Sequence, residues 1–233
     1  MGAAAFLALL IGLPFGVVAL VLALVLSQNR RNSRRQAQLA AWAGHNNLTY
    51  LPAVPSLANY WPGPPFTGGW GAQALDVMTG QTPRGRQFCF FTYQYIVSTG
   101  KSTTVIRIGV TALRLPAALP RLMLTHETAG TKIARFFGGQ DITLESDDFN
   151  RYYRVQSDDQ RFAYGVLHPR AMEWLLGPGR ILAPWRIAGA DLICWHGGEP
   201  NYAWLFPQLG LMDALVDQIP AQVWADYGRK AAP

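Results

Sequence analysis

The sequence contains few residues of the kinds that build redox or metal centres, with only two cysteines and four histidines in 233 residues. Cys89 in QFCFF and Cys194 in LICWH lie in apolar, strand-like runs, where a reduced thiol behaves as a small buried hydrophobic side chain. We therefore expect two free thiols. A Cys89–Cys194 disulfide is the alternative, which a reducing compartment disfavours.

Charge is also scarce, and the net charge of +6 is unevenly placed. Four arginines directly after the first apolar run (Arg30, Arg31, Arg34 and Arg35) leave 16 basic against 14 acidic residues in the rest of the chain. No basic stripe with interleaved aromatic residues follows, so the sequence lacks the electrostatic footprint of a nucleic-acid-binding protein. We expect no nucleic acid among its partners.

Residues 3–26 contain no charged side chain at all. As a helix, a run of this length would extend about 36 Å, which is enough to cross a hydrocarbon core of about 30 Å. A cleaved signal peptide is the alternative, but its apolar part normally has about 7–15 residues, follows a basic residue and precedes a small-residue cleavage site. The sequence therefore predicts an uncleaved transmembrane helix over residues 3–26.

The arginines after this span predict its orientation. Because positively charged residues stay on the cytoplasmic side, the following domain is expected in the cytoplasm of a single-pass membrane protein. The same side chains, Arg30, Arg31, Arg34 and Arg35, are expected to contact anionic lipid headgroups of the bilayer.

Gly12 and Gly16 form a GxxxG pair within the span. Such a pair permits close contact between two membrane helices and would support a weak homodimer. The alternative is that glycine and proline are simply common in membrane helices.

Residues 27–71 are predicted to be a connection and residues 72–228 an α+β domain. The connection begins with the basic segment, continues as a short helix over residues 36–48 and becomes rich in proline and glycine. Its many aromatic residues make a purely solvated tether improbable, so we expect it to lie against the domain. These residues are Tyr60, Trp61, Phe66 and Trp70.

Alternating apolar residues predict an antiparallel sheet in the domain, packed with helices. Strands are expected at 72–79, 86–98, 102–112, RLMLTHE and ITLES, with a final pair of short strands turning at Gly189. Helices are expected at 158–167, at 169–176 with His168 as the junction residue, and from 205 to Pro220, followed by AQVWADY up to Gly228. The apolar face of the long C-terminal helix would comprise Phe206, Leu209, Met212, Leu215, Val216 and Ile219.

The acidic stretch ESDDFNRYYRVQSDDQ, residues 145–160, suggests either a carboxylate site or helix caps. Both SDD tripeptides follow a strand-like run and precede a helix-like one, and serine at an N-cap accepts hydrogen bonds from free backbone N–H groups. We therefore predict Ser146 and Ser157 as N-caps. No metal site and no cofactor are expected, because ligand residues at metal-binding spacing are missing nearby.

The segment from Glu145 to Leu175 resembles an uncharacterised bacterial family whose domain of unknown function is typically tethered to one or two membrane helices. The resemblance rests on Glu145, Phe149, Tyr153, Val155, Ser157, Asp158, Pro169, Met172, Glu173 and Leu175. It implies a membrane-tethered α+β domain and brings no catalytic residue with it.

No nucleophile signature or complete HExxH motif is present, so we assign no catalytic residue. The leading hypothesis is a noncatalytic interaction or scaffold domain at the inner face of the membrane, binding another membrane or cytoplasmic protein through exposed aromatic residues. One alternative is a hydrolase of lipid or envelope precursors using His126 or Asp147 and Asp148. Another is a small-ligand sensor.

Overall fold

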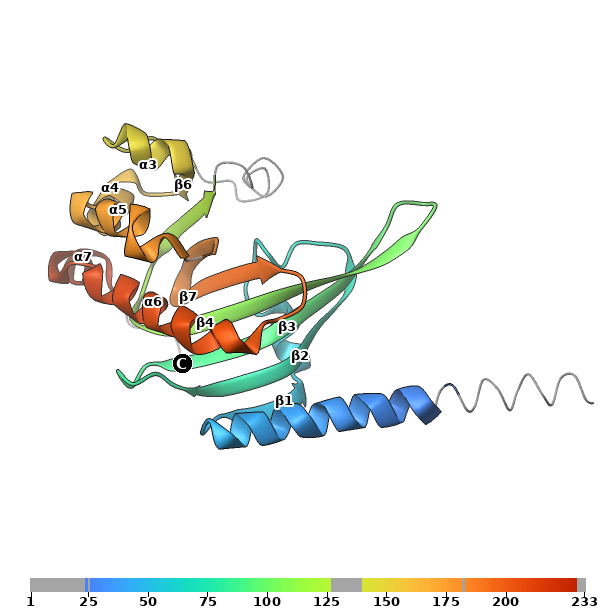
Figure 1. The fold of residues 1–233 in the computed structure, drawn as a ribbon. Coiled ribbons are helices and arrows are strands. Elements are labelled where there is room, and N and C mark those ends of the chain that lie inside the picture. Colours follow the sequence, from blue (N-terminus) through green and yellow to red (C-terminus); the bar gives the residue numbers. More distant parts are fainter. Residues whose placement is uncertain (1–23, 25, 127–139, 182, 230–233) are drawn as a thin grey trace, which may run out of the picture. The chain divides into compact units, whose positions relative to one another are not determined.

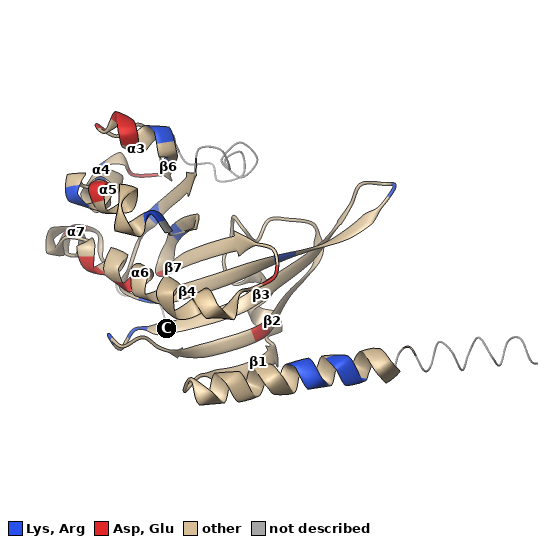
Figure 2. Ribbon diagram, in the orientation of Figure 1, with Lys and Arg blue, Asp and Glu red and all other residues tan. Residues whose placement is uncertain are grey.

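The computed structural model describes residues 24, 26–126, 140–181 and 183–229, and it divides into two units after Asn46. In the first unit, residues 26–45 form a helix, longer than the predicted one, because SQNRRNSRRQAQ contains no glycine or proline to end it. Its four arginines, Arg30, Arg31, Arg34 and Arg35, are exposed and form the two blue bands in Figure 2.

In the described part of the chain, no helix combines the length and the apolar character that crossing a membrane requires. The predicted span over residues 3–26, with Gly12 and Gly16, lies almost entirely outside the described residues. The anchor, its orientation and the helix–helix contact therefore stay predictions.

The second unit has the predicted α+β architecture, an antiparallel sheet packed with helices (Figure 1). The strands pair in the order β1-β2-β3-β4-β6-β5, and β7 pairs with β4. The strands are β1 (Thr49–Ala53), β2 (Trp70–Gln81), β3 (Gln87–Ser98), β4 (Thr103–His126), β5 (Gln140–Ile142), β6 (Tyr153–Ser157) and β7 (Trp185–Gly197). The helices are α3 (Asp147–Tyr152), α4 (Gln160–Val166), α5 (Pro169–Leu176), α6 (Leu205–Gln218) and α7 (Ala221–Tyr227), with short 3-10 turns η1 (Pro55–Asn59), η4 (Pro178–Ile181) and η5 (Tyr202–Trp204).

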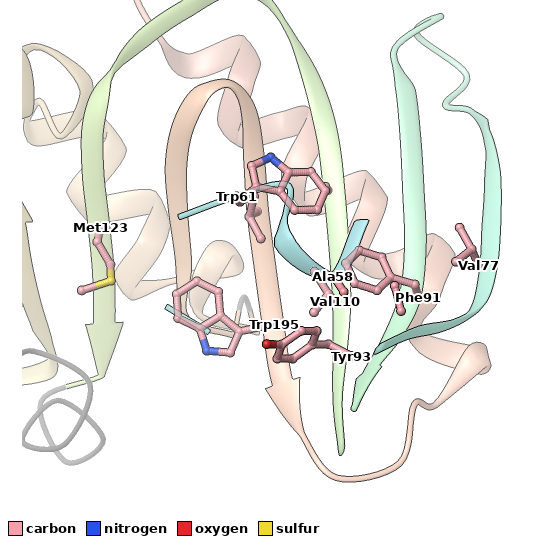
Figure 3. Close-up of a cluster of buried hydrophobic side chains, with 11 residues drawn as sticks. Ala58, Trp61, Val77, Phe91, Tyr93, Val110, Met123 and Trp195 are labelled. Atoms are coloured by element: carbon pink, nitrogen blue, oxygen red, sulfur yellow. The ribbon is translucent and has the colours of Figure 1, made fainter. Parts of the chain in front are cut away.

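The strand β4 is one element of 24 residues, where the sequence predicted two strands. Pro116 and Pro120 lie where the β4–β7 register shifts, so the prolines occupy an irregularity and do not end the strand. On β7, Gly189 has φ +61, and the predicted pair of short strands is one strand that bends there. The bent ribbon brings Met123 into the same buried cluster as Val110 (Figure 3).

The part of the sheet made by β1, β2, β3, β4 and β7 is covered on both faces. Phe90 points toward α6, since its ring meets Tyr202 and its partner residue Thr111 bonds to Gln208. Phe206 was predicted on the buried face of α6 but is 44% exposed, because it lies about 100° around the helix from the fully buried Leu205.

On the other face, the proline- and glycine-rich segment packs on the sheet, as its aromatic residues predicted. Trp61 is 6% exposed and packs against both Phe66 and Phe91, with ring centroids 5.5 and 6.1 Å away (Figure 3 draws Trp61 and Phe91). Its indole Nε1 donates a hydrogen bond of 3.0 Å to Asp191 Oδ2. The segment is therefore part of the core, and β1 and η1 give it regular structure that its prolines concealed.

The two predicted helix caps have different outcomes. Ser146 is the N-cap of α3, and its hydroxyl accepts a hydrogen bond from Phe149 N at 3.2 Å. The cap of α4 is Asp159, which accepts from Phe162 N at 2.9 Å, and not Ser157. Ser157 still pairs with Leu122 of β4, and its hydroxyl donates to Arg121 O at 2.6 Å, so the chain is extended two residues further than predicted.

We predict that Trp61 contributes strongly to stability. Trp61→Ala should lower the free energy of unfolding by about 3–5 kcal/mol, because it leaves a cavity in the aromatic stack. Trp61→Phe should cost about 1–3 kcal/mol, because Asp191 loses a buried donor. Urea unfolding of the full-length protein in micelles, followed by circular dichroism, measures both. Trp70→Ala is the control: Trp70 is 61% exposed, and a loss as large as that of Trp61→Ala would contradict the assignment.

Both cysteines are free, and they lie on opposite faces of the sheet, so the alternative disulfide is wrong. Burial raises the pKa of Cys89 and that of Cys194 to about 12, which leaves both thiols protonated at neutral pH. We predict negligible alkylation by iodoacetamide at pH 8 in the folded protein and full alkylation in urea, measured by intact mass. Rapid modification of Cys89 in the folded protein would contradict this environment.

Candidate functional site

Three cavities in the second unit have the size of small-ligand sites. One of about 300 Å³ lies at the start of α6, and one of about 670 Å³ lies between α5 and the end of α6. The third, of about 740 Å³, lies on the Trp61 face of the sheet.

The cavity at the start of α6 is bounded by β7 and by the first turns of the helix. Ala183, Trp204 and Leu211 give it an apolar surface, while the polar groups of His196, Asn201 and Gln208 lie around it. This is the usual composition of a binding pocket, mostly apolar with a few hydrogen-bonding groups that fix orientation.

Neighbouring contacts hold the wall of this cavity in place. Thr111 Oγ1 lies 3.3 Å from Gln208 Oε1, which ties α6 to β4. The Cys194 thiol lies 3.6 Å from Ala183 O. The cavity is therefore supported by the central strands of the sheet.

His196 lies across β4 at a position where β4 has no side chain. Gly109 is its register partner, and a Cβ built on Gly109 would clash with His196 Nε2 and Cε1. The glycine thus allows the half-buried imidazole to lie flat on the strand beside the cavity.

Two large aromatic side chains are exposed near the start of α6. Trp204 is 54% exposed and lines the cavity, and Phe206, two residues further along, is 44% exposed. Asn201 orders the turn before them, because its Oδ1 accepts a hydrogen bond from Ala203 N at 3.1 Å. Exposed aromatic side chains beside an apolar hollow are typical of a surface that receives a partner.

Sequence reasoning predicted exposed aromatic residues in general but missed this surface. Phe206 was assigned to the buried face, and Trp204 was not singled out. The available signal was Asn201 three residues before Trp204, a capping residue that places the following aromatic residues at a helix start.

The residues named for a hydrolase do not meet in any of these cavities. His126 ends β4 and packs on the Tyr153 ring with centroids 5.2 Å apart. Asp147 and Asp148 lie in the first turn of α3, where Asp148 pairs with Arg151 at 3.4 Å. Within the described ranges, no three His, Cys, Asp or Glu side chains are grouped as metal ligands.

His168 lines the 670 Å³ cavity, yet both of its ring nitrogens have structural partners. Nδ1 accepts from Ala171 N at 3.4 Å as the N-cap of α5, so Nε2 carries the proton that it donates to Gln218 O at 3.1 Å. His168 therefore links two helix ends, the junction role predicted for it.

The basic arginines of the first unit form no part of these cavities. They remain the predicted lipid contacts on an exposed helix.

No protein-family model matches this sequence, and no curated protein matches it either, so the family resemblance drawn from residues 145–175 gains no support. Among solved structures, the chain is similar to the crystal structure of the mycobacterial trehalose monomycolate transport factor A, TtfA. The TM-score is 0.57 at 13% sequence identity, and the similarity covers 85% of this chain and 97% of that chain. At this identity the two proteins share a fold.

We predict that Gly109→Ala destabilises the domain by about 1–3 kcal/mol, because its methyl group would displace the His196 ring from a packed position. The same substitution in a His196→Ala background should cost much less, which thermal or urea unfolding of the four variants would show. Gly197→Ala is the matched control, since a Cβ there meets nothing within 4 Å. An unchanged penalty in the His196→Ala background would contradict the ring placement.

Proposed function

We propose that this chain is a noncatalytic interaction domain, held at the cytoplasmic face of the membrane by residues 3–26. The surface around the start of α6 would bind an apolar side chain and adjoining backbone from another membrane or cytoplasmic protein. The observation that carries this proposal is the exposure of Trp204, which lines an apolar cavity supported by the sheet, with Phe206 also exposed in the first turn of α6.

The energetics favour a partner at this surface. Covering both aromatic side chains would remove on the order of 200 Å² of apolar surface from water, about 5 kcal/mol at 25 cal/mol per Å². Aromatic anchors seated in pockets provide most of the binding energy in many protein interfaces. The polar groups of His196, Asn201 and Gln208 would fix the orientation of such a segment.

A protein partner is favoured over the acyl chain of a lipid by these same groups. Three hydrogen-bonding side chains around a small cavity match the mixed apolar and polar character of a peptide segment. An acyl chain would leave them unpaired.

The fold comparison supports a noncatalytic role in general terms. TtfA is described as a transport factor, a description that names no reaction. Handling of an envelope lipid by an assembly that includes this chain would be consistent with that fold.

The test is site-specific photo-crosslinking in the full-length protein, in its own membranes. A photo-reactive residue at position 204 or 206 should crosslink to a defined protein. Trp204→Ala/Phe206→Ala should weaken binding of that purified protein at least about 30-fold, since truncating a pair of anchors removes 2 kcal/mol or more.

Trp70→Ala/Tyr152→Ala is the matched control, because both of its residues are exposed aromatic residues remote in sequence from α6. It should bind the partner normally. Equal binding by both double variants, or crosslinks to lipid alone, would overturn the proposal.

A further inference from the structure

The groove of about 740 Å³ lies on the face of the sheet that carries Trp61, opposite to the face that α6 covers. Its lining residues come from the start of β1, the end of β2, the start of β3 and the middle of β4 and β7. Cross-strand register places Thr79, Cys89 and Ala112 in one row along its floor, and Gln81 pairs with Gln87 in the next. Because paired residues point to the same face, these side chains form one continuous surface.

Five of the twelve residues that line this groove carry an uncharged hydrogen-bonding side chain, and the others include Trp61, Phe88 and Ala112. These hydroxyl and amide side chains come from three strands and from a position two residues before β1: Asn47, Thr49, Thr79, Gln81 and Gln87. Each hydroxyl and each amide can both donate and accept a hydrogen bond. The thiol of Cys89 is also uncharged at neutral pH, because burial raises its pKa to about 12.

The two charges in the groove balance each other. Arg114 Nη1 lies 3.3 and 3.4 Å from the two carboxylate oxygens of Asp191, and Asp191 also accepts the Trp61 indole hydrogen bond. Neither charge is therefore available as the counter-ion of a charged ligand. The same hydrogen bond holds the edge of the Trp61 indole next to the Arg114–Asp191 ion pair.

We infer that this groove binds a neutral, hydroxyl-rich ligand, a carbohydrate or polyol group that is either free or carried by a lipid. Every hydroxyl of such a ligand is both donor and acceptor, which matches side chains of the same dual character. An apolar ligand would leave the amides and hydroxyls without partners, at a cost for each group. A phosphate or carboxylate would find one arginine, already neutralised by Asp191.

This site is separate from the surface at the start of α6, so it can be present or absent whatever the outcome of the crosslinking test. Its position on the opposite face allows both sites to be occupied at once.

The test uses the full-length protein in phosphatidylcholine nanodiscs, titrated with maltose, sucrose and trehalose and with inorganic phosphate. Amide and indole N–H resonances report binding, and Trp61→Phe assigns the Trp61 indole signal. The neutral disaccharides should shift this signal and the side-chain amides of Gln81 and Gln87. Phosphate should shift none of them.

Gln81→Ala/Gln87→Ala should weaken the disaccharide at least about 10-fold, since it removes two hydrogen-bonding groups. Gln222→Ala on α7 is the matched control and should leave affinity unchanged. Thr49→Val/Thr79→Val is the second test, because it removes two hydroxyls while keeping residues that favour strands. If one of the two double variants unfolds, the disaccharide affinity of the other tests the inference.

Nanodiscs containing a neutral diglycosyl lipid distinguish the two sources of the ligand. If the diglycosyl lipid shifts the same resonances at a far lower sugar concentration than the free disaccharide does, the ligand is a lipid head group. If both are needed at the same concentration, the ligand is a soluble sugar. No shift with any neutral sugar, stronger binding of phosphate, or unchanged affinity in both double variants would overturn the inference.

Discussion

The packing of Trp61 on one face of the sheet is the contact on which the rest of the second unit depends. The indole stacks on Phe66 and Phe91 and donates to Asp191, which is 130 residues away in the sequence. A buried carboxylate requires paired donors, and Asp191 has the indole and Arg114. The Trp61 side chain thus links the segment before β2 to β7, which lies near the C-terminal end of the sequence.

The bend in the β4–β7 ribbon determines where the remaining parts lie. The paired strands β4 and β7 bend together at Pro116, Pro120 and Gly189. The ribbon that they form therefore belongs to both parts of the sheet. On one side, β4 pairs with β3 along its first half and with β6 along its last residues. The ribbon therefore connects the five-stranded part, which carries the candidate sites, to the part packed with α3, α4 and α5 (Figure 1).

The two faces of the five-stranded part offer different chemistry. On the face under α6, exposed aromatic residues and a small apolar cavity lie at the start of that helix, which suits a segment of a partner protein. On the face that carries Trp61, the groove is lined by amides, hydroxyls and one ion pair, which suits a neutral hydroxylated ligand. An interaction domain with both faces could bring such a ligand and a partner protein together without any catalytic residue.

The sequence by itself determined the parts that depend on short-range patterns. Alternation of apolar residues predicted most strands, Pro169 and Gly228 placed helix boundaries, and Ser146 was recognisable as a cap because capping needs only the next three residues. The aromatic residues of the proline-rich segment predicted its packing, because so much apolar surface is costly to leave in water.

Only the tertiary structure decided the features that depend on distant partners. Pro116 and Pro120 end a strand by local rules, but pairing with β7 carries β4 through them. Ser157 has the pattern of a cap, yet pairing with β4 keeps it in a strand and leaves the cap to Asp159. Phe206 belongs to an apolar helical stripe, but in the fold it is 44% exposed while its neighbour Leu205 is buried. The ion pair of Arg114 with Asp191 joins residues 77 apart, so the neutrality of the groove is a property of the fold.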